Sequence, residues 1–237
     1  MLKIIYGMLK RQIIRAKTFL ICGYKYQAEI DPFRILWVNP NQIIHTAHLY
    51  NYGGREELCY VIAGDWDLPK YLFDDKPIVK MMYEHFAHGI EWKKTTPYSE
   101  ILRRVKERGQ SWTKCFSEAD VVSRCAYVDN LYFDIKENGY RVPEGILFGV
   151  SGIAKGYTSG GEVTVNIGLN GTIFYQTGKH RLTIARLLNI PLIPVHVLVR
   201  HQQWQNIREE LLNINNGRHI IKKFTYIDHP DIVYLLR

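Results

Sequence analysis

The sequence lacks the cysteine pairs and the long apolar runs that would identify several classes of protein. Its four cysteines, Cys22, Cys59, Cys115 and Cys125, are scattered and form no C-x-x-C pair. Neither a zinc knuckle nor a compact disulfide framework is therefore expected, and a reducing cytoplasm is the favoured compartment. No uninterrupted apolar run approaches the ~18 residues of a membrane-spanning helix, and no repeat or low-complexity segment is present.

A Walker phosphate-binding loop is also missing. The glycine-rich segment from Gly145 to Gly161 is irregular and lacks the pattern G-x-x-x-x-G-K-[ST]. We interpret this segment as a flexible cover over the functional site.

The composition excludes a disordered protein. The chain has 237 residues, of which 46% are hydrophobic and 13% aromatic, which is enough for one sizeable core or for a small domain with a large insertion. The net charge is +8. A basic chain favours an acidic partner: a nucleic acid, a nucleotide or an anionic membrane surface.

A strand–turn–strand–helix pattern dominates the C-terminal half. Two β-prone runs, Thr164 to Ile167 and Thr172 to Tyr175, are separated by Asn170-Gly171, the strongest short-range signal of a hairpin. Beyond the second run, apolar residues recur at helical spacing as far as Leu188. We therefore predict that the second strand gives way to a helix at or near Gly178.

That helix start has the residues of a phosphate site. Lys179, His180 and Arg181 occupy the predicted first turn, where unpaired backbone N–H groups and the positive end of the helix dipole favour an anionic oxygen. A glycine at position 178 lets a ligand approach the backbone. The alternative interpretation is a basic surface turn without a ligand.

Three pieces of the chain resemble, in the right order, the ParB/sulfiredoxin superfamily. They are an opening strand and turn at Ile35 to Ile43, a helix at Leu131 to Tyr140, and the hairpin that leads through T-G-K-H-R into a helix and the closing strand Ile193 to Val197. The resemblance implies an α+β fold, a small mixed sheet with helices. It divides the chain into a basic amphipathic segment (1–30), a core (31–68 and 130–204), a helical insertion (69–129) and a C-terminal helical tail (205–237).

The superfamily includes three kinds of activity, and local residues separate them. Sulfiredoxins carry a cysteine beside the motif histidine, where this chain has Lys179. Partition proteins carry a Glu-Arg-Arg form and a following DNA-binding domain, whereas only residues 200–237 follow Val199. The remaining members are phosphotransferases such as the free-serine kinases, in which a Gly-x-His-Arg motif holds nucleotide phosphates.

The resemblance implies a set of nucleotide-binding residues: Thr177, Gly178, Lys179, His180 and Arg181, with His180 also catalytic. Phosphoryl transfer requires positioning and charge neutralisation more than covalent help, and it also needs a carboxylate elsewhere in the chain to deprotonate the acceptor hydroxyl.

Two carboxylates follow a β-prone run that ends near Ala63. If the strand continues, Asp65 and Asp67 lie on one face, where they suit a catalytic base or a Mg²⁺ site. The alternative is a capped turn, because aspartate is a common turn residue. Asp134 and Glu137 are rival carboxylates, since the resemblance places their helix beside the same site.

The resemblance, together with these residues, implies a nucleotide-dependent phosphotransferase that uses ATP and Mg²⁺ and acts on a hydroxyl group of a small-molecule or glycan-like acceptor. The first alternative is a ParB-like, nucleotide-gated nucleic-acid-binding or nuclease-type protein. The second is a non-catalytic nucleotide-binding scaffold with a membrane-surface helix.

The N-terminal segment is the source of that last alternative. In a helix, Leu2, Ile5, Leu9, Ile13 and Ala16 share one face, and five basic residues gather opposite. This pattern is typical of an amphipathic helix at an anionic membrane surface. The competing interpretation is a peripheral helix that packs on its own domain and exposes a basic face to solvent.

Overall fold

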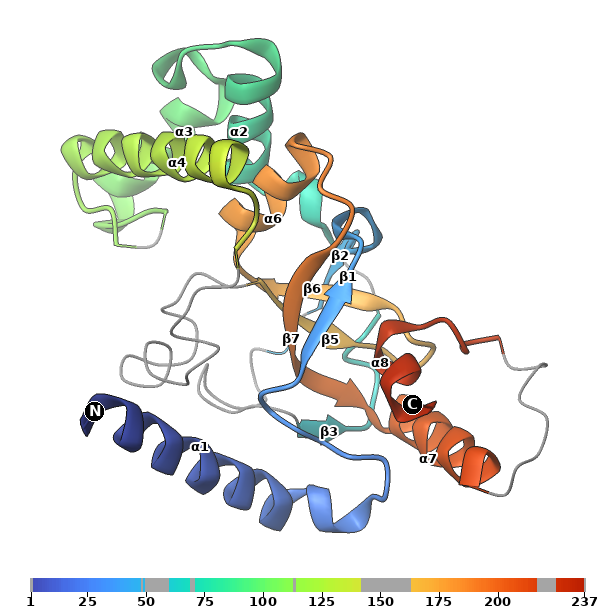
Figure 1. The fold of residues 1–237 in the computed structure, drawn as a ribbon. Coiled ribbons are helices and arrows are strands. Elements are labelled where there is room, and N and C mark those ends of the chain that lie inside the picture. The colour runs from blue at the N-terminus through green and yellow to red at the C-terminus, as the bar shows by residue number, and fades with distance from the viewer. Residues whose placement is uncertain are drawn as a thin grey trace. The chain divides into compact units, whose positions relative to one another are not determined.

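The computed structural model describes residues 2–47, 49, 60–68, 71–112, 114–141, 163–216 and 225–236 (Figure 1). The chain is a mixed α and β protein with a seven-stranded mixed sheet. It divides into two compact units. The sheet unit comprises Met1–Tyr71, Val142–Gly178 and Leu192–Arg237, and the helical unit comprises Leu72–Arg141 and Lys179–Pro191. The expected glycine-rich cover lies outside the described residues.

The sheet is built around its longest strand. Its strands are β1 (Ile35–Val38), β2 (His45–Thr46), β3 (Tyr60–Ile62), β4 (Tyr71–Leu72), β5 (Val163–Ile167), β6 (Ile173–Thr177) and β7 (Ile193–His201). Their order is β1-β7-β5-β6-β2-β4, and β3 also pairs with β7. β7 runs antiparallel to β1 and parallel to β3 and β5. Every residue of β5 and β7 is buried, as expected for central strands.

The predicted hairpin is confirmed. β5 and β6 pair antiparallel, and the turn between them is closed by a hydrogen bond from Gly171 N–H to the Gly168 carbonyl at 3.0 Å. Gly171 has φ +83°, and a Cβ atom there would lie 2.7 Å from the Trp204 ring. Both the positive φ and the close aromatic neighbour require glycine at this position.

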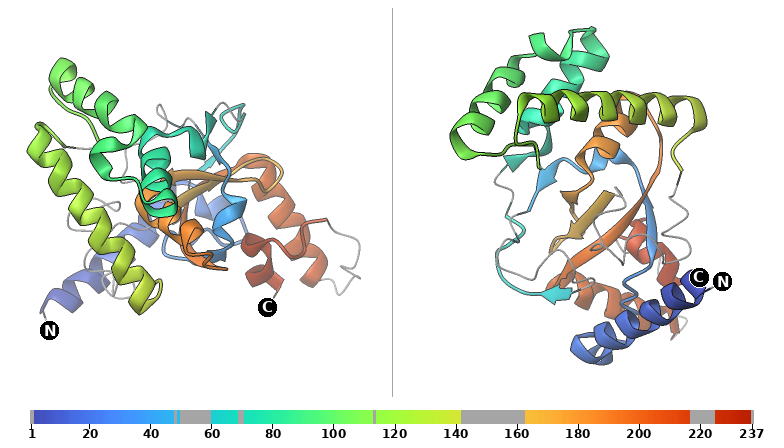
Figure 2. Two further views of the ribbon diagram at one scale, coloured as in Figure 1. Left: turned by 90° about the horizontal axis from the view of Figure 1, so that it is seen from above. Right: turned by 90° about the vertical axis from the view of Figure 1, so that its left-hand side faces the viewer.

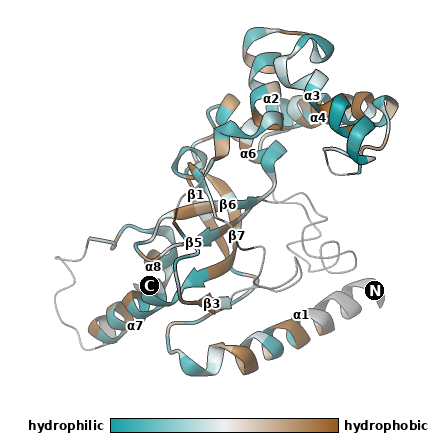
Figure 3. Ribbon diagram, turned by 180° about the vertical axis from the view of Figure 1, so that it is seen from behind, coloured by the Kyte–Doolittle hydropathy of each residue, from teal (hydrophilic) through white to brown (hydrophobic). Residues whose placement is uncertain are grey.

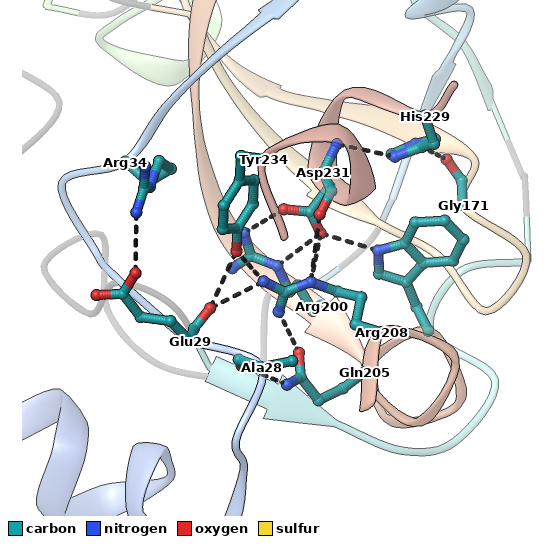
Figure 4. A network of polar contacts seen from close by, with 11 residues as sticks. Ala28, Glu29, Arg34, Gly171, Arg200, Gln205, Arg208, His229, Asp231 and Tyr234 are labelled. Atoms are coloured by element: carbon teal, nitrogen blue, oxygen red, sulfur yellow. Dashed lines mark hydrogen bonds and ion pairs between the residues drawn. The ribbon is translucent and has the colours of Figure 1, made fainter. Parts of the chain in front are cut away.

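A polar network ties the C-terminal segment to the sheet unit (Figure 4). Arg200, at the end of β7, forms a bidentate ion pair with Asp231 of α8 (Pro230–Val233). Arg208 and Trp204 of α7 (Gln202–Asn216) contact the same carboxylate. The described residues of the expected C-terminal helical tail (205–237) are therefore part of the core of the sheet unit. The expected start of this tail, at residue 205, falls inside α7.

The helical unit has its own apolar core. Its helices are η3 (Phe73–Asp75), α2 (Pro77–His88), η4 (Trp92–Lys94), α3 (Thr96–Arg108), α4 (Glu118–Asn138) and α6 (Lys179–Leu187). Met81, Met82, Ile101, Val128 and Ile184 are among the buried side chains that bring α2, α3, α4 and α6 together. Figure 2 shows the green α2, α3 and α4 gathered with the orange α6.

The sequence-based boundary of the helical insertion is wrong. It was expected between residues 129 and 130, but this point falls inside α4, which runs unbroken from Glu118 to Asn138. A capping box of Ser117 and Asp120 begins the helix. Its buried residues continue across the expected boundary, from Val128 to Ile135. Because α4 is one helix with one continuous buried face, the helical insertion ends after the C-terminus of α4 and not at residue 129.

The N-terminal segment forms α1 (Leu2–Ile21), followed by η1 (Gly23–Lys25). Ile14 packs against a buried cluster that includes Phe33 and Leu198. Arg15 forms a 2.8 Å ion pair with Asp31. These contacts attach α1 to the sheet unit. No described helix is long and apolar enough to cross a membrane.

Candidate functional site

The predicted strand-to-helix junction is confirmed. β6 ends at Thr177, the chain passes through Gly178 with φ +88°, and α6 begins at Lys179. Only glycine adopts this φ without steric cost. The first N–H groups of an α-helix have no carbonyl acceptor within the helix. The first turn of α6 therefore offers backbone donors of the kind that bind an anionic oxygen.

His180 is oriented by a residue that sequence reasoning missed. The indole N–H of Trp112 donates to His180 Nε2 at 2.9 Å. Because Nε2 accepts, the neutral imidazole carries its proton on Nδ1. The imidazole also lies edge-to-face with the rings of Trp112 and Tyr127, at centroid distances of 5.8 and 6.5 Å.

His180 is neutral at physiological pH. Burial, together with the charges of Lys179 and Arg124, lowers its pKa to about 3. A histidine with the ordinary pKa of 6.5 can carry a positive charge, but the surroundings of His180 keep it neutral, with its proton on Nδ1. The reason is tertiary: the aromatic residues that surround it and the cation of Arg124 come from distant parts of the chain.

We predict that the His180 imidazole does not titrate between pH 8 and about pH 4, because its pKa lies near 3. The unfolded chain takes up this proton near pH 6.5 and the folded chain does not, so this group removes stability as pH falls from 6.5 towards 3. Nitrogen-detected NMR of the imidazole should show one unchanged Nδ1–H tautomer over that range. A titration midpoint near 6.5 would contradict the buried, indole-bound geometry.

Arg181 is placed by an aromatic ring. Its guanidinium lies over the Tyr140 ring, with Cζ 5.5 Å from the centroid. Such a cation–π contact limits the conformations of a long side chain. The guanidinium N–H groups can still donate hydrogen bonds. Tyr140 follows the end of α4, and its role had no signal in the sequence beyond its residue type.

Thr177 faces a row of polar side chains in the sheet unit. Its hydroxyl shares a 2.7 Å hydrogen bond with Thr164, and the neighbouring Gln176 accepts from Asn166 Nδ2 at 3.0 Å. The β5–β6 register shifts between Thr164 and Val165, and such bulges re-aim side chains. Thr164 and Asn166 are fully buried. Thr177 therefore stabilises the end of β6 directly before Gly178.

The structure corrects the expectation that Asp65 and Asp67 lie on one face of a continuing strand. β3 ends at Ile62, and Gly64 turns the chain with φ +95°. A backbone hydrogen bond from Leu68 to Asp65 at 3.4 Å closes the turn. Asp65 is exposed, whereas Asp67 is only 6% exposed. The two carboxylates therefore have different surroundings.

Asp67 stabilises the turn between β5 and β6. Its Oδ2 accepts the Leu169 N–H at 2.7 Å, and a Cβ atom on Gly168 would lie 2.6 Å from the same oxygen. Oδ1 is buried and has no hydrogen-bond partner among the described residues. Asp67 thus has a structural contact on one oxygen and an unused acceptor on the other.

The rival carboxylates lie on the exposed surface of α4. Asp134 accepts a hydrogen bond from Asn138 Nδ2 at 3.0 Å, four residues along the same helix. Glu137 is exposed. Among the described residues, no group of three His, Cys, Asp or Glu side chains is placed to hold a metal ion.

The structure thus brings Lys179, His180 and Arg181 together on one turn of the helical unit, whereas Asp65 and Asp67 belong to the sheet unit. Comparison with protein families, with curated proteins and with solved structures gives no match to this chain. The ParB/sulfiredoxin resemblance stays a prediction that rests on the residues quoted for it.

Proposed function

We propose that this chain is a nucleotide-dependent phosphotransferase whose phosphate-binding element is the first turn of α6. One observation carries the proposal. A strand passes through the positive-φ Gly178 into a helix that begins with Lys179, His180 and Arg181. A glycine junction, backbone donors and cationic side chains at a helix start are the features that bind phosphate in many folds.

Each side chain of this turn has a distinct part in holding the phosphates. Lys179 supplies a compact positive charge, and Arg181 supplies a fork of donors that matches a phosphate oxygen pair. His180 is neutral and donates through Nδ1–H, since Trp112 occupies Nε2. Phosphoryl transfer depends mainly on such positioning and charge neutralisation.

In this proposal, Asp65 and Asp67 provide the groups that act on the acceptor hydroxyl and on Mg²⁺. Asp65 is exposed and is the residue we assign to the proton of the acceptor hydroxyl, which belongs to a small-molecule or glycan-like compound. Asp67 Oδ1, which has no hydrogen-bond partner among the described residues, is the kind of oxygen ligand that Mg²⁺ prefers. When bound with ATP, Mg²⁺ would neutralise charge on the phosphates.

The order of elements supports the superfamily assignment that underlies this proposal. β1, the β5–β6 hairpin, α6 and β7 follow one another along the chain as the resemblance implies. A ParB/sulfiredoxin-like core in a cytoplasmic protein is part of the same proposal.

The nucleic-acid alternative draws less support from the structure. Arg103 pairs with Glu100 at 2.7 Å and with Glu107, and Arg104 pairs with Glu100 at 2.7 Å. These two basic side chains of α3 are therefore neutralised in place. The net charge of +8 is the feature that still favours this alternative.

Replacing Arg181 by alanine tests the proposed phosphate element. A charged hydrogen bond is worth about 1.5–3 kcal/mol, so the affinity for ATP with Mg²⁺, measured by isothermal titration calorimetry, should fall at least about tenfold. Arg108→Ala is the matched control, because Arg108 is exposed at the end of α3 in the same unit. Equal affinities in two folded variants would leave only a basic surface turn.

A further inference from the structure

α1 turns an apolar face to solvent. Leu9, Ile13 and Leu20 are four and seven residues apart, so they lie on one side of the helix. Their exposures are 60%, 58% and 73%. In the competing interpretation α1 packs on its own domain and exposes a basic face, so Leu9 and Ile13 should be buried. The structure shows the reverse for both residues.

The opposite face of α1 is the one that packs on the sheet unit. Thr18 and Cys22 are buried, and Ile14 contacts the cluster around Phe33. The Arg15–Asp31 ion pair adds a polar attachment. The helix is thus held in place, and the exposure of its apolar side does not come from a detached element.

Further exposed apolar side chains lie in the last turn of α1 and just beyond the helix. Phe19 and Tyr24 are both 59% exposed, and Ile21 is 41% exposed. In Figure 3 brown, hydrophobic segments alternate with teal ones along the part of α1 that is coloured. Several large apolar side chains exposed on one element indicate an interaction surface.

The charges next to this surface identify the kind of partner. Residues 2–21 contain five basic residues and no acidic one, and one of the five, Arg15, is paired with Asp31. Lys17 and Lys25 are exposed, and Lys25 Nζ lies 5.6 Å from the centroid of the exposed Tyr24 ring. A second copy of the chain would bring the cations of both helices together, which is unfavourable. A partner with a negatively charged surface above an apolar layer would complement both the apolar side chains and the basic residues of α1.

We infer that α1 lies in the plane of an anionic lipid surface, with Leu9, Ile13 and Leu20 inserted among the acyl chains and the lysines among the headgroups. A helix of this length covers about 30 Å of the surface, and amphipathic helices of this composition bind at the headgroup boundary. This inference is independent of the proposed phosphotransferase activity, because it concerns a different element.

Vesicle flotation with the full chain tests the inference. Wild-type protein should float with vesicles made of phosphatidylcholine and phosphatidylglycerol in equal parts, and much less with phosphatidylcholine alone. The double variant Ile13→Gln, Leu20→Gln should lower the partition coefficient on the mixed vesicles by at least about tenfold. Its melting temperature should stay that of the wild type, because both side chains are largely exposed.

Two controls distinguish binding through α1 from non-specific hydrophobic adsorption and from non-specific electrostatic attraction. Phe133→Gln with Leu192→Gln makes similar changes at exposed apolar sites outside α1 and should leave flotation unchanged. Lys17→Glu with Lys25→Glu should lower flotation with the mixed vesicles and weaken its dependence on salt.

Three results would overturn the inference. They are no flotation with either kind of vesicle, equal flotation with both kinds, and a dimer in sedimentation velocity that Ile13→Gln with Leu20→Gln dissociates. The last would show that a second copy covers the apolar face.

Discussion

Asp231→Asn is expected to lower the free energy of unfolding by about 3–5 kcal/mol, the usual cost of removing one partner from a buried ion pair. Asp231 is fully buried, as is Arg208, and Arg200 is 1% exposed. Arg200 Nη2 lies 2.6 Å from Asp231 Oδ1, and the indole N–H of Trp204 donates to Oδ2 at 2.9 Å. The amide keeps the shape of the carboxylate but removes the negative charge that pairs with two buried guanidinium groups.

The loss should depend on pH. Burial opposes ionisation of Asp231, but the charges of Arg200 and Arg208 outweigh it and hold the pKa of this carboxyl well below 3.8. A depressed folded-state pKa contributes stability that is fully present above the unfolded pKa. The difference between wild type and Asp231→Asn should therefore be largest above pH 4 and shrink as pH falls below 3.8.

Urea unfolding followed by circular dichroism measures both effects. Asp228→Asn is the matched control, because Asp228 lies three residues away and is exposed; its unfolding free energy should stay within about 0.5 kcal/mol of the wild-type value. A loss below about 1 kcal/mol for Asp231→Asn would mean that this carboxylate does not organise the network in Figure 4.

Asp65→Asn is expected to lower kcat for ATP-dependent phosphorylation of a hydroxyl acceptor by about 10²–10⁴, if Asp65 takes the proton of the acceptor. The amide keeps the shape of the side chain and removes its basicity, so ATP affinity should barely change. Because Asp65 is exposed, the unfolding free energy should also stay close to that of the wild type. The measurement is steady-state nucleotide turnover with a pool of hydroxyl acceptors.

Asp67→Asn is the contrasting variant. Its Oδ2 accepts the Leu169 N–H at 2.7 Å in a buried position, so this change should cost about 1–3 kcal/mol of stability. If Asp67 also contributes to Mg²⁺ binding, ATP affinity should become less dependent on magnesium. Unchanged turnover in Asp65→Asn, Asp67→Asn, Asp134→Asn and Glu137→Gln together would show that none of these carboxylates is the base.

Local patterns predicted the elements that nearby residues specify. Asn170-Gly171 between two β-prone runs predicted the hairpin, and the apolar spacing after Gly178 predicted α6. β1 followed in the same way from a short β-prone run after Pro32. Each of these depends on residues within a few positions of one another, which is where propensity and turn chemistry act.

The site residues show where such patterns fail. Lys179, His180 and Arg181 were placed correctly on a first helical turn, but the neutrality of His180 depends on Trp112, which lies 68 positions away in sequence. Asp65 and Asp67 were placed after a strand, yet a turn at Gly64 gave them opposite environments. A pKa or an exposure is set by whatever packs nearby in space, and no local pattern encodes that.

The sequence by itself determined the hairpin, the helix that follows Gly178, the absence of acidic residues from α1 and the net charge of +8. Only the tertiary structure decided that Arg200 and Arg208 are buried around Asp231, that α4 is one helix and that the apolar side of α1 faces solvent. The reason is physical. Turns and helix starts are governed by backbone conformation over a few residues, whereas burial depends on long-range contacts between segments far apart in the chain.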